Sequence, residues 1–403
     1  MNPYLQKLQP YPFEKLSALK AGVSPPADLP HIALSIGEPK HPAPEFVLEA
    51  LCASLDGLSQ YPLTRGIPEL REAIARWLER RFQLGIKTVD AETQVLPVNG
   101  TREALFAFAQ AIVNAQANET VLMPNPFYQI YEGAAYLAGA TPVFYNTTAA
   151  TGYVPDFDAI SDAQWRDCRL LYICSPGNPS GAVIPRQTLI DLIAKARQFD
   201  FIIASDECYS EIYFDEASPP AGLLEAALAC GNTVFENCVV FHSLSKRSNL
   251  PGLRSGFVAG DANVLKQFLL YRTYHGCAMS PIVQHASISA WNNEQHVIDN
   301  RKLYLQKFDA VIDILSPVIK VNRPDAAFYL WLQTPMDDTE FTRQLFAQQN
   351  VTVLPGSYLS REANGRSGLE NPGSGHVRMA LVAPLEECIS AAKRIREFIE
   401  TKA

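Results

Sequence analysis

The chain has 403 residues, of which 47% are apolar, and this is enough to bury a large core and to exclude an intrinsically disordered protein. The net charge of −8 and the scattered positions of lysine and arginine argue against a nucleic-acid partner. No apolar run reaches the roughly 18 residues of a membrane span, and residues 1–20 lack a secretion-signal pattern, so we expect a soluble, cytoplasmic protein.

The first 45 residues contain many prolines, which predict an extended arm rather than an independent domain. An arm of this kind can pack on a partner subunit. Helical spacing follows over 45–55 and 67–83, and Pro68 occupies a first-turn position of the second helix. One face of that helix carries Leu70, Ile74, Trp77 and Leu78.

Between residues 95 and 260, short β-rich runs alternate with helical segments such as 101–115 and 186–199. The runs cover 120–123, 142–145, 169–173, 201–204, 239–241 and 256–259. This alternation predicts a mostly parallel sheet covered by helices on both faces.

A second region follows a helical stretch over 266–292 and a long helix over 294–315. Its runs at 328–332, 351–354 and 377–381 predict a smaller sheet, 385–402 predicts a closing helix, and the Gly-rich stretch 356–375 predicts a long functional loop. We therefore expect three parts. These are an arm over 1–45 that belongs partly to the small domain, a large domain over 46–290 and a small domain over 291–403.

Polar residues follow four of the predicted strands, at the end where open parallel sheets bind their ligands. They are Asn125, Asn178, Asp206 and Lys246. Each of them alone is also typical of a turn, and Lys246 alone would be an ordinary surface lysine. Their joint occurrence indicates a site at this edge of the sheet.

Lys246 lies just after the apolar run 239–241, and Arg254 follows between Gly252 and Gly256 in a loop with little steric bulk. A lysine, the hydroxyls of the serines beside it and an arginine suit an imine-forming amine next to a phosphate, as pyridoxal phosphate requires. Asp206 follows a fully apolar run and needs a cationic partner, which a protonated pyridine nitrogen would provide.

Three further candidates carry weaker signals. Tyr209 and Asn178 can hydrogen-bond a ring oxygen, although Tyr209 is equally typical of a packed aromatic side chain. Residues 100–102 offer backbone amides at a helix N-terminus, which is a ready phosphate cradle. Tyr128 can stack on a flat heterocycle or lie in the core. The eight cysteines form no Cys-x-x-Cys pair and predict reduced, buried side chains and no metal site.

Eight motifs occur together in one order. They are Tyr61-Pro-x-x-x-Gly66, Asn99-Gly-Thr-Arg-Glu-Ala104, Pro124-x-Pro-x-Tyr128, Asn178-Pro-x-Gly181, Asp206-Glu-x-Tyr209, Ser243-x-Ser-Lys246, Gly252-x-Arg254 and Val377-Arg378. In order and spacing the whole chain resembles the class I/II, fold-type-I aminotransferases that use pyridoxal phosphate. The resemblance implies an α/β fold, with a mostly parallel seven-stranded sheet between helices in the large domain, a smaller α+β domain and a homodimer with shared active sites.

The resemblance also implies a role for each site residue. Lys246 forms the imine with the cofactor and acts as the base, Asp206 pairs with the pyridinium, Tyr209 and Asn178 contact the ring oxygen, and Tyr128 stacks on the ring. The phosphate is held by Gly100, Thr101, Arg102, Ser243, Ser245 and Arg254, with Tyr61 reaching it from the partner subunit. Arg378 binds the substrate α-carboxylate, together with Asn178 and the backbone near Gly37. Alanine at 326 and 327, where relatives commonly carry glycine, leaves the substrate contacts there open.

The predicted activity is ping-pong transamination with 2-oxoglutarate as the acceptor. Residues 1–16 and 35–44 resemble the N-succinyl-diaminopimelate aminotransferases of lysine biosynthesis, which implies a long acidic donor. Cationic candidates for its far carboxylates are Lys40, Arg65, Arg247 and Arg272, and we hypothesise that 271–275 shapes the distal pocket.

Other functions share the same cofactor residues. Aspartate and aromatic aminotransferases, carbon–sulfur lyases and cyclopropane-forming synthases all remain alternatives, because the motifs indicate the cofactor more firmly than the reaction. A transcription regulator that binds pyridoxal phosphate would need a DNA-binding module, for which the 45-residue arm is too short.

Overall fold

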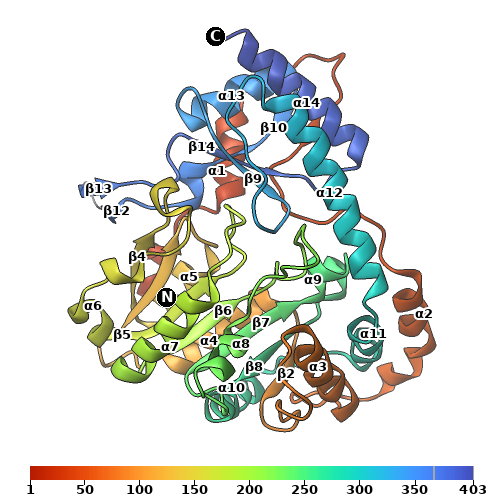
Figure 1. Ribbon diagram of the computed structural model, residues 1–403, viewed down its shortest axis with the longest axis vertical. Coiled ribbons are helices and arrows are strands. Elements are labelled where there is room, and N and C mark those ends of the chain that lie inside the picture. Colours follow the sequence, from red (N-terminus) through yellow and green to blue (C-terminus); the bar gives the residue numbers. More distant parts are fainter. Residues whose placement is uncertain (366–367, 403) are drawn as a thin grey trace.

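The computed structural model describes residues 1–365 and 368–402. Its larger part is built on a seven-stranded sheet with the strand order β2-β8-β7-β6-β5-β3-β4 (Figure 1). The strands are β2 (Val95–Val98), β3 (Thr120–Asn125), β4 (Thr141–Asn146), β5 (Cys168–Cys174), β6 (Ile202–Asp206), β7 (Cys238–Ser243) and β8 (Gly256–Gly260). Neighbouring strands are parallel except that β8 runs antiparallel to both β2 and β7. The mostly parallel sheet and the α/β fold predicted from the sequence are confirmed.

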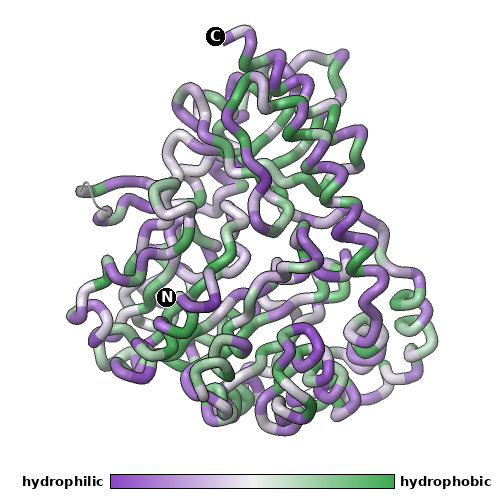
Figure 2. The backbone as a smooth tube through the Cα atoms, in the orientation of Figure 1, coloured by the Kyte–Doolittle hydropathy of each residue, from purple (hydrophilic) through white to green (hydrophobic). Residues whose placement is uncertain are grey.

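Helices cover both faces of this sheet, so its strands are apolar on both sides. Along β5, for example, Leu171 and Ile173 belong to one core cluster while Leu170 and Tyr172 belong to the other. The first cluster includes residues of α3 (Pro68–Arg81), α6 (Asp162–Asp167), α7 (Arg186–Phe199), α8 (Leu223–Ala229) and α11 (Pro281–Trp291). The second includes residues of α4 (Thr101–Ile112), α5 (Ile130–Ala138) and α10 (Ala262–His275). In Figure 2 these helices carry both hydrophobic and hydrophilic residues, as helices with one buried face do.

The smaller part contains an antiparallel sheet with the order β11-β14-β9. Its strands are β9 (Tyr329–Gln333), β11 (Leu354–Pro355) and β14 (His376–Ala380), and its helices are α12 (Gln295–Leu315), α13 (Asp338–Gln349) and α14 (Leu385–Glu400). Near the start of the chain, β1 (Ile32–Ala33) pairs in parallel with β10 (Val351–Thr352). This pairing supports the predicted share of the first 45 residues in the small domain. The three domain boundaries stay a prediction.

The structure differs from the predicted elements in five places. The run 351–354, predicted as one strand of the smaller sheet, is divided, because β10 pairs with β1 and, of the two strands in this run, only β11 joins β14. The arm is not extended throughout, because prolines in first-turn positions begin η1 (Pro3–Lys7) and α1 (Pro12–Lys20). The predicted helical stretch 266–292 is split into α10 and α11, since Gly276 ends one helix at φ 81° and Pro281 begins the next. Strand β2 was not among the predicted runs. The loop 356–375 contains η6 (Gly356–Leu359) and the hairpin strands β12 (Ala363–Gly365) and β13 (Gly368–Glu370).

The remaining predicted helices are present, including α2 (Glu45–Ala53) after the arm. All eight cysteines are free as predicted, but only Cys168, Cys238 and Cys388 are buried, while Cys52 is exposed and the other four are half-buried. Within residues 1–365 and 368–402, no helix combines the length and the apolarity required to span a bilayer.

Candidate active site

A cavity of about 370 Å³ lies at the carboxyl ends of the central strands, where the small sheet and the arm also meet them. It is lined by residues predicted from the sequence, namely Gly37, Thr101, Arg102, Tyr128, Asn178, Asp206, Tyr209, Ser243, Ser245, Lys246, Arg254 and Arg378. The fold therefore collects into one cavity predicted residues that are up to 341 positions apart, as from Gly37 to Arg378.

Lys246 lies on the short helix α9 (Leu244–Arg247), directly after β7. Its Nζ donates a hydrogen bond to the carbonyl of Gly37 and lies 5.3 Å from the centroid of the Phe328 ring. Burial lowers the pKa of Lys246 to about 8, although the neighbouring Cys208 opposes this shift. A lowered pKa keeps a larger share of the amine neutral near physiological pH, and the neutral amine is the nucleophilic form.

Asp206 ends β6 and is buried. Its Oδ2 accepts a 2.6 Å hydrogen bond from the Tyr131 hydroxyl, and its Oδ1 accepts one from the Cys208 backbone N–H. Burial raises the pKa of Asp206, and no lysine or arginine among the described residues forms an ion pair with it. A buried carboxylate without a cation fits a ligand that supplies one, such as a protonated pyridine ring.

An anion cradle surrounds the start of α4. Gly100 has φ 82°, and a Cβ at this position would lie 2.3 Å from a guanidinium nitrogen of Arg254, so only glycine fits here. The first N–H groups of α4, at Thr101 and Arg102, have no partner within the helix and point out of its N-terminus. The hydroxyl-bearing Ser245 lines the same cavity. These groups can together bind a phosphate.

Arg378 extends from β14 into the other end of the cavity. One Nη donates to Oδ1 of Asn178 at 2.9 Å, the other Nη donates to the Ser35 carbonyl at 2.8 Å, and the guanidinium lies 4.5 Å from the Tyr329 ring centroid. A Cβ at Gly37 would lie 2.0 Å from the Tyr329 hydroxyl, so the chain passes very close to this ring. A planar guanidinium held in this way can bind a carboxylate through two hydrogen bonds.

The lining residues that the sequence did not indicate include five that carry aromatic rings or a thiol next to the predicted ones. They are Tyr11 and Phe13 of the arm, Tyr131 of α5, Cys208, and Tyr329 of β9. The Tyr329 hydroxyl lies 2.9 Å from that of Tyr209, and the Cys208 Sγ lies 3.0 Å from Oγ1 of Thr101. In the sequence each of these aromatic side chains resembles an ordinary core residue, and only its long-range contacts distinguish it.

Two of the predicted residues do not line the cavity in this chain. Gly100 lies directly behind Arg254 and shapes the cradle through the backbone. Tyr61 is fully exposed, so its contact with the phosphate of a partner subunit stays a prediction. Asn125, a strand-end residue, instead donates to Asn146 and to the Arg361 carbonyl, which gives it a structural role.

The cations suggested for the far end of the donor lie elsewhere as well. Arg272 is fully buried and forms two hydrogen bonds of 2.9 and 3.0 Å to Glu103, so it is not free to shape a distal pocket. The other three candidates, Lys40, Arg65 and Arg247, form ion pairs with Glu387, Glu92 and Glu294 respectively. None of the four lines the cavity of the described chain.

Residues 30–387 match the model of the family described as aminotransferase class I and II. The chain belongs to this family. It is 32% identical over 400 residues to an LL-diaminopimelate aminotransferase of Maridesulfovibrio salexigens, with 98% of each chain covered. A solved aminotransferase of Neisseria meningitidis is similar, with a TM-score of 0.93, 50% identity and coverage of 99% of this chain and 100% of that chain. The aminotransferase AspB of Helicobacter pylori has a TM-score of 0.88 and 34% identity, with coverage of 98% and 99%.

Aminotransferases of this family use pyridoxal phosphate, and the cavity fits it. The uncompensated carboxylate of Asp206 suits the pyridine nitrogen, the cradle at Gly100 suits the phosphate, and Lys246 supplies the amine. When bound, pyridoxal phosphate withdraws electrons from the substrate Cα.

The lowered pKa of Lys246 predicts how quickly the cofactor attaches to protein from which it has been removed. We expect the attachment rate to rise with pH and to level off above about 8, because the neutral amine is the reacting form. Stopped-flow absorbance at a series of pH values measures this rate. An increase that continued towards the ordinary lysine pKa of about 10.4 would contradict the prediction.

Proposed function

We propose that this aminotransferase moves an amino group from N-succinyl-L,L-2,6-diaminopimelate to 2-oxoglutarate by a ping-pong mechanism. The position of Arg102 is the observation that supports an acidic amino donor. The described residues that line the cavity include four cations, and Lys246, Arg254 and Arg378 have the amine, phosphate and α-carboxylate roles. The Arg102 side chain remains for the second carboxylate that donor and acceptor share.

The surroundings of Arg102 support this assignment. Arg102 is exposed, and its guanidinium lies 5.5 Å from the ring centroid of Tyr11, which lines the same cavity. The backbone N–H of Arg102 points to the phosphate cradle while its side chain is free to extend towards the arm. One residue can therefore serve both the phosphate and the far end of the substrate.

The other residues keep the roles predicted for them. Asp206 pairs with the pyridinium, Tyr209 and Asn178 bind the ring oxygen, and Tyr128 stacks on the ring. Backbone amides at 100–102 and the side chains of Ser243, Ser245 and Arg254 hold the phosphate. Arg378 and the backbone at Gly37 orient the substrate α-carboxylate, and the Lys246 amine takes the proton from Cα.

A second donor, LL-diaminopimelate itself, is favoured by one observation. The exposed carboxylate of Glu38 lines the same cavity and can bind the free ammonium group that a succinylated donor lacks. The relative at 32% identity carries this substrate in its name. Aspartate and aromatic donors remain the alternative for this family.

Replacing Arg102 with glutamine is expected to raise the KM for the succinylated donor and for 2-oxoglutarate by about 10- to 100-fold, which corresponds to one lost charge-assisted hydrogen bond. The KM for alanine, which has one carboxylate, should stay unchanged. Steady-state kinetics with the three substrates measure this. Arg197→Gln, which alters an exposed arginine outside the cavity, is the matched control.

Glu38→Gln separates the two diaminopimelate donors. It should raise the KM for LL-diaminopimelate only if the free ammonium binds there, and it should leave the KM for the succinylated donor unchanged.

For Arg102→Gln, an equal rise in the KM of alanine and of the dicarboxylic substrates would contradict an acidic donor.

We also propose a homodimer with shared active sites. Several apolar side chains are exposed on residues 55–63 and on α10, among them Leu58, Tyr61, Leu63 and Tyr274. Exposed apolar groups of this size are typical of an interface, and Tyr61 would enter the partner's site from it. Sedimentation equilibrium tests this proposal, and a species with the 44.5 kDa mass of one chain at micromolar concentration would contradict it. The cytoplasmic location stays a prediction.

A further inference from the structure

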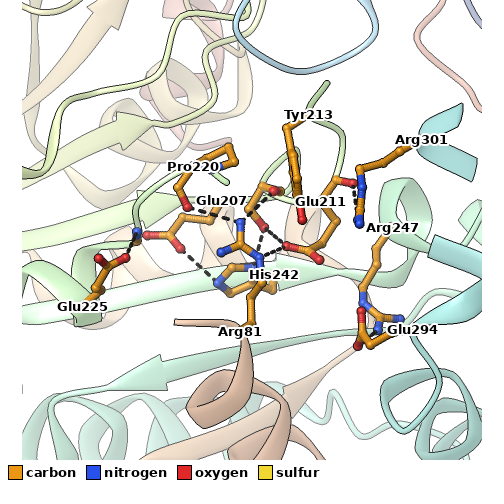
Figure 3. A network of polar contacts seen from close by, with 12 residues as sticks. Arg81, Glu207, Glu211, Tyr213, Pro220, Glu225, His242, Arg247, Glu294 and Arg301 are labelled. Atoms are coloured by element: carbon orange, nitrogen blue, oxygen red, sulfur yellow. Dashed lines mark hydrogen bonds and ion pairs between the residues drawn. The ribbon is translucent and has the colours of Figure 1, made fainter. Parts of the chain in front are cut away.

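The residue after the reactive lysine holds the α11–α12 junction. Arg247 is 1% exposed, and its guanidinium donates to the carbonyls of Ala290 (2.9 Å) and Asn293 (3.1 Å) and to Oε1 of Glu294 (2.5 Å). Figure 3 shows this pair on the right of the network, with Arg247 reaching from α9 towards Glu294. Arg247 thus joins the short helix that carries Lys246 to the start of α12.

The next two residues make contacts to the same helix. The Ser248 hydroxyl accepts from Arg247 at 3.1 Å and lies 2.8 Å from Nε2 of His296, the second residue of α12. Burial lowers the pKa of His296 to about 4, so this ring is neutral and Nε2 can accept the Ser248 hydroxyl proton. Asn249, held at φ 54°, donates to Oδ1 of Asn300 at 3.0 Å. Each side chain of residues 247–249 therefore contacts α12 or the junction before it, and these three residues are here called the α12 clamp.

Helix α12 leads from this clamp to the smaller part of the molecule (Figure 1). Its later residues Phe308, Val311 and Leu315 are fully buried in the core that also contains Val377 and Met379 of β14. The clamp therefore joins the segment of Lys246 to the helix that packs with the strand of Arg378.

Stability alone gives little reason for a charged group at this position. Burial of the Arg247 guanidinium has a large desolvation cost, and its carboxylate partner Glu294 has a side chain that is 41% exposed, so the attraction between them is weakened by solvent. What Arg247 provides is fixed geometry, because the planar guanidinium is held by four acceptors and lies 4.9 Å from the Trp291 ring centroid and 5.5 Å from that of Trp77. A fixed backbone at Arg247 also fixes the positions of Cα and Cβ of the neighbouring Lys246.

We propose that Arg247 is a positioning residue: by anchoring α9 to the α11–α12 junction, it sets where the Lys246 amine lies in the cavity. The inference rests on the proposed role of Lys246. It goes further by assigning the placement of that amine to a residue that touches neither cofactor nor substrate.

The test compares Arg247→Lys with Arg301→Lys in the full-length enzyme. Lysine keeps the charge but lacks the fork that reaches several acceptors. Arg301 is the matched control, because it is also a buried arginine and lies on α12. It binds the partly exposed carboxylate of Glu216 at 2.6 Å and the Glu211 carbonyl at 3.5 Å. It makes no hydrogen bond to the segment of Lys246.

Arg247→Lys should lower kcat about ten-fold or more, as expected when a catalytic group is misplaced by about an ångström. The KM for the amino donor should change by less than about three-fold, because the groups that bind substrate are intact. The attachment of pyridoxal phosphate to Lys246 should slow by about the same factor as kcat. Arg301→Lys should leave kcat and the attachment rate unchanged, even if both variants melt at lower temperatures.

If Arg247→Lys does not fold, Glu294→Ala replaces it, since Arg247 then keeps its two carbonyl partners. Glu294→Ala should slow attachment, whereas Glu294→Gln, which keeps an oxygen acceptor, should restore it. Equal effects of the Arg247 and Arg301 variants would overturn the proposal. Attachment at the wild-type rate in Arg247→Lys or, where that variant does not fold, in Glu294→Ala would also overturn it. Failure of the proposed role of Lys246 would look different, because the Lys246→Ala variant would then still attach pyridoxal phosphate covalently.

Discussion

Replacing Lys246 with alanine is expected to lower the rate of transamination by about 10⁴-fold or more, because one side chain supplies both the attachment of the cofactor and the general base. Three features of the structure support this expectation. The amine lies in the cavity beside the Gly37 carbonyl, and Asp206 and Arg378 line the same cavity. Burial also lowers the pKa of Lys246 to about 8.

Reduction with borohydride provides the direct measurement for this prediction. It should fix the cofactor on the peptide that contains Lys246 in the wild-type enzyme and on no lysine in Lys246→Ala. Lys307 is the internal control, because burial lowers its pKa to about 8 as well, yet it contacts His41 and the Val382 carbonyl outside the cavity. A reduced adduct on Lys307, or near wild-type turnover by Lys246→Ala, would contradict the assignment.

Asp206→Asn is expected to lower kcat by about 10²- to 10³-fold, an effect of the size found when one preorganised electrostatic contact is removed from an active site. The amide is nearly the same size and can still accept the hydrogen bond from Tyr131. It has no negative charge, however, so it no longer favours a protonated pyridine nitrogen, and the ring becomes a weaker electron acceptor. Single-turnover kinetics with the amino donor measure the affected step.

The control for this variant is Asp261→Asn. Asp261 is about as buried as Asp206, but its Oδ1 caps α10 by accepting hydrogen bonds from the N–H groups of Asn263 and Val264, and its Oδ2 accepts one from the Asn237 N–H. Asparagine is an equally good cap, so turnover should be unchanged. Similar losses in both variants would indicate a general effect of removing a buried carboxylate, and would count against a role for Asp206 in holding the cofactor proton.

Several elements were predictable because their signals are local. Helix α7 begins and ends where its apolar spacing predicts, and α3 begins at the proline that favours a first turn. The strands of the large sheet read as continuous apolar runs since helices cover both of its faces. Strand β2 was missed because it has four residues with Pro97 among them, and its pairing partner β8 lies more than 150 positions away.

The site residues that lie at or just after the ends of strands could be predicted from the sequence. Asp206 and Lys246 follow β-rich runs, so parallel topology was enough to expect them at one edge. Tyr131 and Tyr329 could not be found in this way. Neither follows a strand: Tyr131 lies on α5 and Tyr329 begins β9, and each hydroxyl meets a partner 75 or 120 positions away.

The sequence by itself determined most of the order of helices and strands, the cofactor and the lysine that we propose as the reactive one, because apolar periodicity, glycine, proline and polar strand ends act over a few residues. The tertiary structure decided what each charge does. It placed Arg272 in a buried pair with Glu103, left the Arg102 side chain at the cavity, and anchored Arg247 on the junction before α12. These outcomes depend on burial and on which distant segments meet, and neither is encoded in the spacing of neighbouring residues.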